Sequence, residues 1–217
     1  MGRPTIIVTG SAGGIGRAIA DSFPGCIEID KHNCDLSNDS ETRRFALKIR
    51  GPVKALINCA GVSLQSAYGD LDAWDKTFAV NVRAVFHLCS ILRHEITEGG
   101  SIINITSMNA EVATPFNPAY IASKGALKML TKAMALDWAQ YGIRVNNVCP
   151  GYIHTNMTHQ SWSDPEKSKV RTERTMLKRW GEPKDLIGIC HFLVSDESSY
   201  ITGADFVVDG GWLAKGT

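Results

Sequence analysis

Residues 5–16 read Thr5-Ile6-Ile7-Val8-Thr9-Gly10-Ser11-Ala12-Gly13-Gly14-Ile15-Gly16. Residues 5–9 are a continuous run of mostly β-branched side chains, which is typical of a strand buried in a parallel sheet. Four glycines follow within residues 10–16, and a helical pattern begins at residue 17. This order predicts a dinucleotide site, because glycines permit a tight turn and the helix N-terminus attracts a pyrophosphate. A glycine turn without a ligand is the alternative.

Composition narrows the class of protein. The chain has 217 residues, is 44% hydrophobic and carries 23 basic against 22 acidic residues. This predicts one domain, with no nucleic acid and no anionic membrane surface as partner. No apolar run reaches transmembrane length, and Met1-Gly2-Arg3-Pro4 does not resemble a signal peptide. The six cysteines and six histidines are scattered, so we expect free thiols, no metal and a cytoplasmic location.

Tyr120 and Lys124 are the candidate proton-transfer pair. Their spacing places both side chains on one face of a helix. A tyrosine alone, with a pKa of about 10, is a poor base at neutral pH. A nearby lysine charge stabilises the phenolate and lowers that pKa, so the pair is able to exchange a proton with an alcohol or alkoxide. A solvated pair on an ordinary helix is the alternative.

The glycine spacing T-G-x-x-x-G-x-G, together with Tyr120 and Lys124, resembles the short-chain dehydrogenase/reductase family. Asn81 and Ser107 match the other two members of that family's catalytic tetrad. The resemblance implies that Tyr120 is the general acid or base, Ser107 positions the substrate oxygen, and Lys124 binds the nicotinamide ribose. It implies that Asn81 kinks its helix and holds a relay water. A satisfied core asparagine is the alternative for Asn81.

The resemblance also implies a set of cofactor contacts. They come from the glycine turn, from the ends of the next strands, from the catalytic pair and from a Pro-Gly motif: Gly10, Gly14, Ile15, Gly16, Asp30, Asp35, Leu36, Asn58, Ala60, Gly61, Tyr120, Lys124, Pro150, Gly151, Ile153 and Thr155. The carboxylate of Asp30 would accept bonds from ribose hydroxyls and repel a 2′-phosphate, so NAD is expected over NADP. Lys31 and His32 follow and would soften that repulsion. A solvated acid at a strand end is the alternative for Asp30.

One departure from the family pattern changes the expected sheet. Only four residues separate Asp30 from Asp35, and a crossover needs ten or more. We therefore expect a single doubly wound Rossmann-type α/β domain over residues 1–217, with a mostly parallel sheet that lacks one strand–helix unit after the second strand. Long helices are expected over residues 71–94, ended by Gly99-Gly100, and over residues 118–138.

Residues 156–180 form the least regular segment, which the family uses as a substrate lid. Six basic residues and three acidic ones lie within it. An anionic substrate or an acidic carrier protein would be attracted, but a solvated helix face is the favoured explanation of these charges. The family also builds its subunit interface from the helix over residues 118–138 and the long helix before it, which implies a homo-oligomer, a tetramer or a dimer.

The predicted function is an NAD(P)(H)-dependent oxidoreductase that interconverts a secondary alcohol and a ketone. One rival is a catalytically silent NAD(H)-sensing regulator on the same fold, because a fold does not fix a function. The other is a scaffold that binds no cofactor. An enoyl reductase is disfavoured, because family members with that activity space their tyrosine and lysine more widely than Tyr120 and Lys124. The small-molecule substrate itself is not identified by the sequence.

Overall fold

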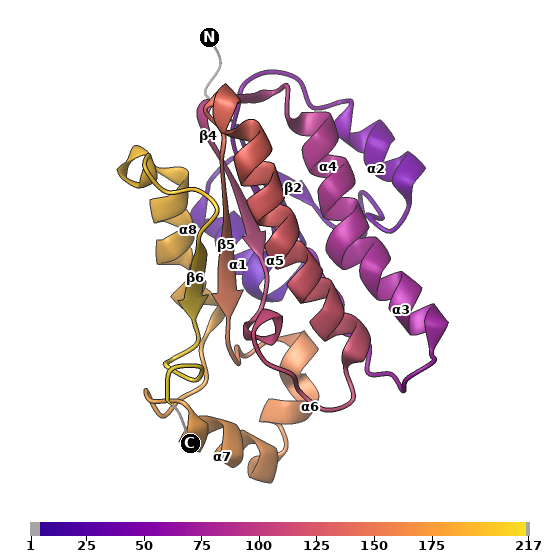
Figure 1. The fold of residues 1–217 in the computed structure, drawn as a ribbon, viewed down its shortest axis with the longest axis vertical. Coiled ribbons are helices and arrows are strands. Elements are labelled where there is room, and N and C mark those ends of the chain that lie inside the picture. Colours follow the sequence, from indigo (N-terminus) through magenta and orange to yellow (C-terminus); the bar gives the residue numbers. More distant parts are fainter. Residues whose placement is uncertain (1–4, 216–217) are drawn as a thin grey trace.

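The computed structural model describes residues 5–215, so the expectation drawn from Met1-Gly2-Arg3-Pro4 lies outside the described residues. Its centre is a six-stranded sheet in the order β2-β1-β3-β4-β5-β6, in which every neighbouring pair is parallel (Figure 1). The strands are β1 (Thr5–Thr9), β2 (Ile27–Ile29), β3 (Val53–Asn58), β4 (Ile96–Ile105), β5 (Arg144–Pro150) and β6 (Asp205–Val208). This confirms the predicted Rossmann-type architecture.

Helices cover both faces of the sheet. They are α1 (Gly14–Ser22), α2 (Asp39–Ala46), α3 (Leu71–Phe78), α4 (Ala84–Leu92), α5 (Pro118–Trp138), α6 (His159–Trp162), α7 (Pro165–Arg174) and α8 (Ile187–Val194). A π-helical turn, Ala79–Arg83, joins α3 to α4. Figure 1 shows α6 and α7 beyond the carboxyl ends of the strands, where β5 and β6 point. Within residues 5–215, no helix has the length and apolar character needed to cross a membrane.

The core forms two layers because successive strand side chains point to opposite faces. Ile7 and Ile102 pack on the side of α4 and α5. Val8 and Ile103 pack on the side of α1 and α8. All four are fully buried, and burying each such side chain contributes about 1.5–3 kcal/mol to folding. The near-continuous apolar strands of the sequence follow from this two-sided burial.

The sheet ends at β2, which confirms the missing strand–helix unit. In the usual dinucleotide-binding order a further strand lies outside the second one. Here the chain runs from β2 directly to α2, and the intervening Cys34 and Leu36 are buried in the same core cluster as Ile29 and Ala46. These two side chains close the sheet edge that a crossover helix would otherwise cover.

One sequence expectation about helices was wrong. The helix expected over residues 71–94 is present as α3, the π-helical turn that contains Asn81, and α4, and it ends at Leu92. Gly99-Gly100 does not stop a helix; both glycines lie inside β4 at a register shift against β3. Gly99 has φ +75°, and a Cβ on Gly100 would lie 2.4 Å from the Ile96 side chain. Glycine is required there by a bulge in the strand.

The segment expected to be the least regular is largely helical. After a 3₁₀ turn over Asn156–Thr158, α6 and α7 occupy most of residues 159–174. Asp164 caps α7 by accepting the N–H groups of Glu166 and Lys167 with its side chain, and Pro165 occupies the first turn. An N-cap aspartate followed by proline is a helix start signal that is present in the sequence. The polar composition therefore belongs to an exposed helix and not to irregular structure.

A row of polar side chains crosses the sheet on the α5 face. Asn58, Asn104, Asn147 and Asp205 occupy paired positions on β3, β4, β5 and β6. Asn58 donates to Asn104 (2.8 Å), Asn104 to Thr131 of α5 (2.7 Å), Thr131 to Asn147 (2.6 Å), and Asn147 to Asp205 (2.7 Å). Buried hydrogen bonds of this kind fix a single arrangement. They therefore set the position of α5, which carries Tyr120 and Lys124.

Candidate active site

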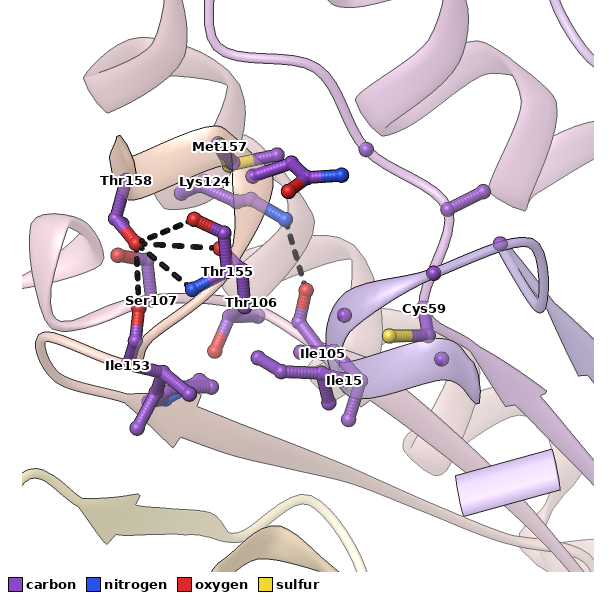
Figure 2. Close-up of a pocket in the computed structure, with 18 of the residues that line it drawn as sticks. Ile15, Cys59, Ile105, Thr106, Ser107, Lys124, Ile153, Thr155, Met157 and Thr158 are labelled. Atoms are coloured by element: carbon purple, nitrogen blue, oxygen red, sulfur yellow. Dashed lines mark hydrogen bonds between the residues drawn. The ribbon is translucent and has the colours of Figure 1, made fainter. Parts of the chain in front are cut away.

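A cavity of about 250 Å³ lies at the carboxyl ends of the strands (Figure 2). The residues lining it that the sequence predicted are Gly10, Gly14, Ile15, Gly16, Ala60, Gly61, Ser107, Tyr120, Lys124, Pro150, Gly151, Ile153 and Thr155. Those that it did not predict are Gly13, Cys59, Ile105, Thr106, Asn156, Met157 and Thr158. The cavity therefore unites the glycine turn with the proposed proton-transfer groups.

The glycine turn forms an open cradle, and side chains larger than hydrogen would clash at two of its positions. Gly10 has φ +72°, and a Cβ there would lie 2.8 Å from the Ala60 backbone. A Cβ on Gly16 would lie 2.1 Å from the Gly10 carbonyl oxygen. The N-cap of α1, Gly13, has no side chain to satisfy the first N–H groups of that helix. The open turn and the free N–H groups fit the pyrophosphate of a dinucleotide.

Thr9 ties the glycine turn to the neighbouring strand end. Its buried Oγ1 accepts the backbone N–H groups of Cys59 and Ala60, each at 3.0 Å. This brings the turn after β3 against the turn after β1, as the short Gly10–Ala60 approach requires. The sequence predicted Thr9 only as a strand residue. Its hydroxyl at the end of an otherwise apolar strand is the feature of the sequence that could have indicated this role.

Lys124 and Tyr120 lie near each other, without a hydrogen bond between them. The Lys124 Nζ atom is 5.6 Å from the centre of the Tyr120 ring and donates to the Ile105 carbonyl at 2.8 Å (Figure 2). Burial lowers the pKa of Lys124 to about 8. Burial also raises the pKa of Tyr120 above its ordinary value, while a hydrogen bond with Ser107 opposes the rise.

The expected lowering of the Tyr120 pKa by Lys124 is therefore not observed in this geometry. Desolvation of the phenolate outweighs the favourable contact with Ser107. The phenol keeps its proton at neutral pH, which suits it to donate that proton to an oxygen held in the cavity. Removing a proton from an alcohol requires the lysine charge to come closer to the phenol oxygen.

Ser107 follows β4 at the edge of the sheet where Rossmann-type folds bind ligands. Its backbone is extended, and its Oγ accepts the N–H of Asn109 at 3.1 Å, which caps a 3₁₀ turn over Met108–Ala110. The side chain lines the cavity and contacts Tyr120. Its hydroxyl therefore lies at the cavity surface beside that tyrosine.

Asn81 lies in the π-helical turn behind the cavity wall. Its fully buried side chain donates to the Val62 carbonyl (2.9 Å) and to Ser123 Oγ (3.0 Å), and it accepts the Val62 N–H (2.8 Å). A Cβ on Gly61 would lie 3.4 Å from Asn81 Oδ1 and 3.6 Å from Lys124 Nζ. The amide thus anchors the turn after β3 beside Lys124, in agreement with a satisfied core asparagine. Its part in a water relay stays a prediction.

Two predicted cofactor residues point away from the cavity. The amide of Asn58 turns into the sheet, where it donates to Asn104 and to the Cys89 thiol (3.3 Å). Leu36 is buried in the core beside β2. Both side chains pack around the strands, and they influence the site only by fixing where those strands lie. Neither side chain is among the residues that line the cavity.

The two predicted acidic contacts lie outside the cavity as well. Asp30 accepts the N–H of His32 at 2.8 Å with one carboxylate oxygen, and its other oxygen forms no hydrogen bond within the described residues. Asp35 accepts from both the N–H and the hydroxyl of Ser37. These bonds hold the pKa of Asp35 below its usual value. Asp30, at the end of β2, keeps an oxygen available for a ligand.

The loop after β5 is organised by Thr158, which was not predicted. Its hydroxyl donates to the Ile153 carbonyl (2.5 Å) and accepts the Thr155 N–H (3.1 Å), as Figure 2 shows. This T-x-x-T capping pattern was present in the sequence. Met157, which follows Asn156, lines the cavity and is half-exposed. The loop therefore presents a rigid backbone and a flexible apolar side chain to the cavity.

All six cysteines are free thiols, and four of them are buried. Within residues 5–215, no three His, Cys, Asp or Glu side chains gather as metal ligands would.

The parallel sheet, the open glycine turn and the cavity at the strand ends define a nucleotide-binding Rossmann-type protein. Residues 17–213 match a family model described as Enoyl-(Acyl carrier protein) reductase. Gluconate 5-dehydrogenase of Gluconobacter oxydans (strain 621H) is 40% identical over 165 residues, which are 74% of this chain and 64%, less than two thirds, of that enzyme. L-xylulose reductase of Mesocricetus auratus is 36% identical over 98% of this chain and 92% of its own length.

A solved structure agrees with these relatives. Gluconate 5-dehydrogenase from Burkholderia cenocepacia J2315, in complex with NADP and tartrate, has a TM-score of 0.89 and 29% identity over 99% of this chain and 96% of that one. The chain therefore belongs to the short-chain dehydrogenase/reductase family, and it is an enzyme of that oxidoreductase class.

Proposed function

We propose that the protein is an NAD(P)(H)-dependent oxidoreductase that interconverts a secondary alcohol and a ketone, with Tyr120 as general acid and base. The observation that carries this proposal is the meeting of Ser107, Tyr120 and Lys124 in the cavity that the glycine turn also lines. A catalytically silent NAD(H)-sensing regulator remains the second candidate, and a measured turnover separates the two.

The chain's own residues manage the proton and the substrate oxygen. The hydroxyl of Ser107 orients that oxygen, and Tyr120 gives it a proton during reduction or removes one during oxidation. Lys124 is able to leave the Ile105 carbonyl for a ribose hydroxyl, which would bring its charge toward the phenol. Asn81 keeps the turn behind Lys124 in place. The nicotinamide, when bound, supplies the hydride chemistry.

The residues that would hold the dinucleotide are those of the cradle. The glycine turn and the N-terminus of α1 would bind the pyrophosphate, Ile153 and Thr155 the nicotinamide half, and Asp30 the adenosine ribose. The free carboxylate oxygen of Asp30 favours NAD over NADP. NADP is bound by the Burkholderia relative, so the preference of this chain is a proposal to be measured.

The substrate is proposed to be a small polyhydroxylated ketone or alcohol. The named relatives act on gluconate and xylulose.

The lid is proposed to be residues 156–180, which begin with the cavity-lining Asn156 and Met157. Part of its positive charge holds the lid itself: Arg171 stacks 4.6 Å from the Tyr152 ring and Arg174 4.0 Å from the Trp212 ring. An acidic carrier protein is therefore not needed to explain the basic side chains.

A homo-oligomer is proposed through α4 and α5. Phe86 on α4 is 55% exposed, and Met129 and Leu136 on α5 are more exposed still. Large apolar side chains that stay exposed on these two helices support a surface that another chain covers. A second copy of the same chain fits, because a two-fold axis pairs one patch with itself. A cytoplasmic location stays a prediction.

Fluorescence titration with NADH and NADPH, followed by turnover assays, tests the proposed function. We expect NADH to bind more tightly than NADPH, and Asp30→Ala to reduce that difference. Reduction of polyhydroxylated ketones with the preferred dinucleotide should follow. Binding without turnover on any ketone or alcohol would favour the sensing regulator, and a lack of binding by either dinucleotide would contradict both.

A further inference from the structure

Helix α5 holds the segment that carries Ser107 at two points, one on each side of that residue. Lys124 donates to the carbonyl of Ile105, two residues before Ser107, at 2.8 Å. Lys128 donates to the carboxylate of Glu111, four residues after Ser107. The two lysines are spaced by four residues, so they lie one turn apart on the same face of α5. The helix therefore grips both the end of β4 and the turn that follows it.

The turn after Ser107 is closed by its own hydrogen bonds. Ser107 Oγ accepts the N–H of Asn109 at 3.1 Å, and the N–H of Glu111 donates to the backbone of the same turn at 3.0 Å. Among the residues that the structure describes, the Lys128–Glu111 pair is the one hydrogen bond that joins residues 108–114 to another element. The turn is thus a small unit with a single polar attachment to α5.

Lys128 is itself fixed by the sheet. Its ammonium lies 3.4 Å from the carboxylate of Asp205 on β6. Asp205 also accepts the amide of Asn147 at 2.7 Å, at the end of the polar row described above. The Lys128 side chain is 19% exposed and that of Glu111 is 36% exposed. Salt screens a partly buried pair of this kind less than a fully exposed one.

We propose that Lys128 is a positioning residue, which keeps Ser107 against Tyr120 by tying the turn at Glu111 to α5. Under the proposed function, on which this inference rests, Lys124 leaves its strand carbonyl for a ribose hydroxyl. The Glu111 pair is then the attachment that still supports the contact between Ser107 and Tyr120. Lys128 is not among the residues that line the cavity, so it acts through the turn.

Steady-state kinetics on the full chain test this role, with the polyhydroxylated ketone and the dinucleotide that give the wild type its highest turnover. A misplacement of about 1 Å costs about 10²-fold in rate, so a loosened turn in Lys128→Met is expected to lower kcat about tenfold. The NADH dissociation constant should stay within about twofold, since the cradle is unchanged. A general loss of structure would weaken both.

Three further variants show whether the contact itself matters. Glu111→Gln should lower kcat as much as Lys128→Met does. The double variant should be no slower than either single variant, because both changes remove one contact. Lys128→Arg keeps the charge and the donors, so kcat should return to within about threefold of wild type.

Lys132→Met is the matched control, because it removes the same charge from the next turn of α5. Lys132 lies 3.4 Å from Asp205, and within the described residues it makes no ion pair with Glu111. We expect its kcat to stay within about twofold of wild type. Hydrogen exchange of residues 108–114 gives a readout that does not need turnover. It should be faster in Lys128→Met and in Glu111→Gln, and unchanged in Lys132→Met.

Three kinetic results would overturn the inference: near-wild-type kcat in both Lys128→Met and Glu111→Gln, an equal loss in Lys132→Met, or losses that add in the double variant. If Lys128→Met is too unstable to assay, Glu111→Gln gives the comparison at a more exposed position. Wild-type protein that turns over no ketone or alcohol would contradict the proposed function. Exchange of residues 108–114 that Lys128→Met and Glu111→Gln leave unchanged would contradict the attachment alone.

Discussion

The Lys124 ammonium donates to the Ile105 carbonyl at 2.8 Å, across the seam between α5 and the end of β4. The side chain is only 4% exposed, and its one hydrogen bond does not offset the loss of water. Its pKa consequently falls to about 8. The group needed for chemistry is thus a source of instability in the fold.

Lys124→Met is expected to raise the melting temperature at pH 7 by a few degrees while abolishing turnover. The sign follows from the lowered pKa. Between about pH 8 and 10.5 the unfolded chain binds a proton that the folded chain does not. Stability therefore rises with pH in that window, and the advantage of the variant should fade there. Thermal melts of both proteins from pH 6 to 11 measure it.

Lys128→Met, one turn further along α5, is the matched control. Its hydrogen bond with Glu111 raises the Lys128 pKa, so its charge stabilises the fold below the unfolded value and that contribution is lost as pH rises through the folded value. This variant should lower the melting temperature at pH 7. Equal shifts in both variants would contradict the assignment of burial as the dominant effect on Lys124.

Tyr120→Phe is expected to reduce turnover at least about a hundredfold, because it removes the group that transfers the proton. NADH affinity should stay within about twofold of wild type, since the ring remains in the cavity wall. Steady-state kinetics and fluorescence titration give the two numbers. Near-wild-type turnover would exclude Tyr120 as the acid and base.

Thr9→Val is expected to destabilise the protein and weaken NADH binding together. The change leaves the half-buried N–H groups of Cys59 and Ala60 without their acceptor, at a cost of up to about 1–3 kcal/mol for each. Thr9→Ser keeps the oxygen and should retain most of both properties. Urea unfolding and NADH titration on the two variants separate the hydroxyl from the methyl group; equal losses in both would show that packing, not the hydrogen bonds, is responsible.

Phe86→Glu is expected to shift the protein toward the monomer in sedimentation velocity. If α4 lies in the subunit contact as proposed, a carboxylate there is costly to desolvate. Tyr68→Glu, at a 94% exposed loop position, is the control and should leave the assembly unchanged. An unaltered sedimentation coefficient in Phe86→Glu would place the subunit contact elsewhere.

The sequence predicted those features that depend on local backbone requirements. Gly10 and Gly16 are required by close backbone approaches, and Tyr120 and Lys124 share a face because helical spacing places them there. The missing strand–helix unit followed from a four-residue link that is too short for a crossover. The prediction that Gly99-Gly100 stops a helix was wrong, because the register shift of β4 against β3 depends on contacts between distant parts of the chain.

The glycine turn, the shortened sheet and the chemical groups of the cavity could thus be predicted from the sequence. The partners of those groups became visible only in the folded chain. Asn58 turns into the sheet because Asn104 lies beside it in register, and Lys124 meets Ile105 because α5 crosses the end of β4. These partners are distant along the chain, and the periodicity of the sequence does not say which of them will meet. Strand register and helix packing bring them within hydrogen-bond distance.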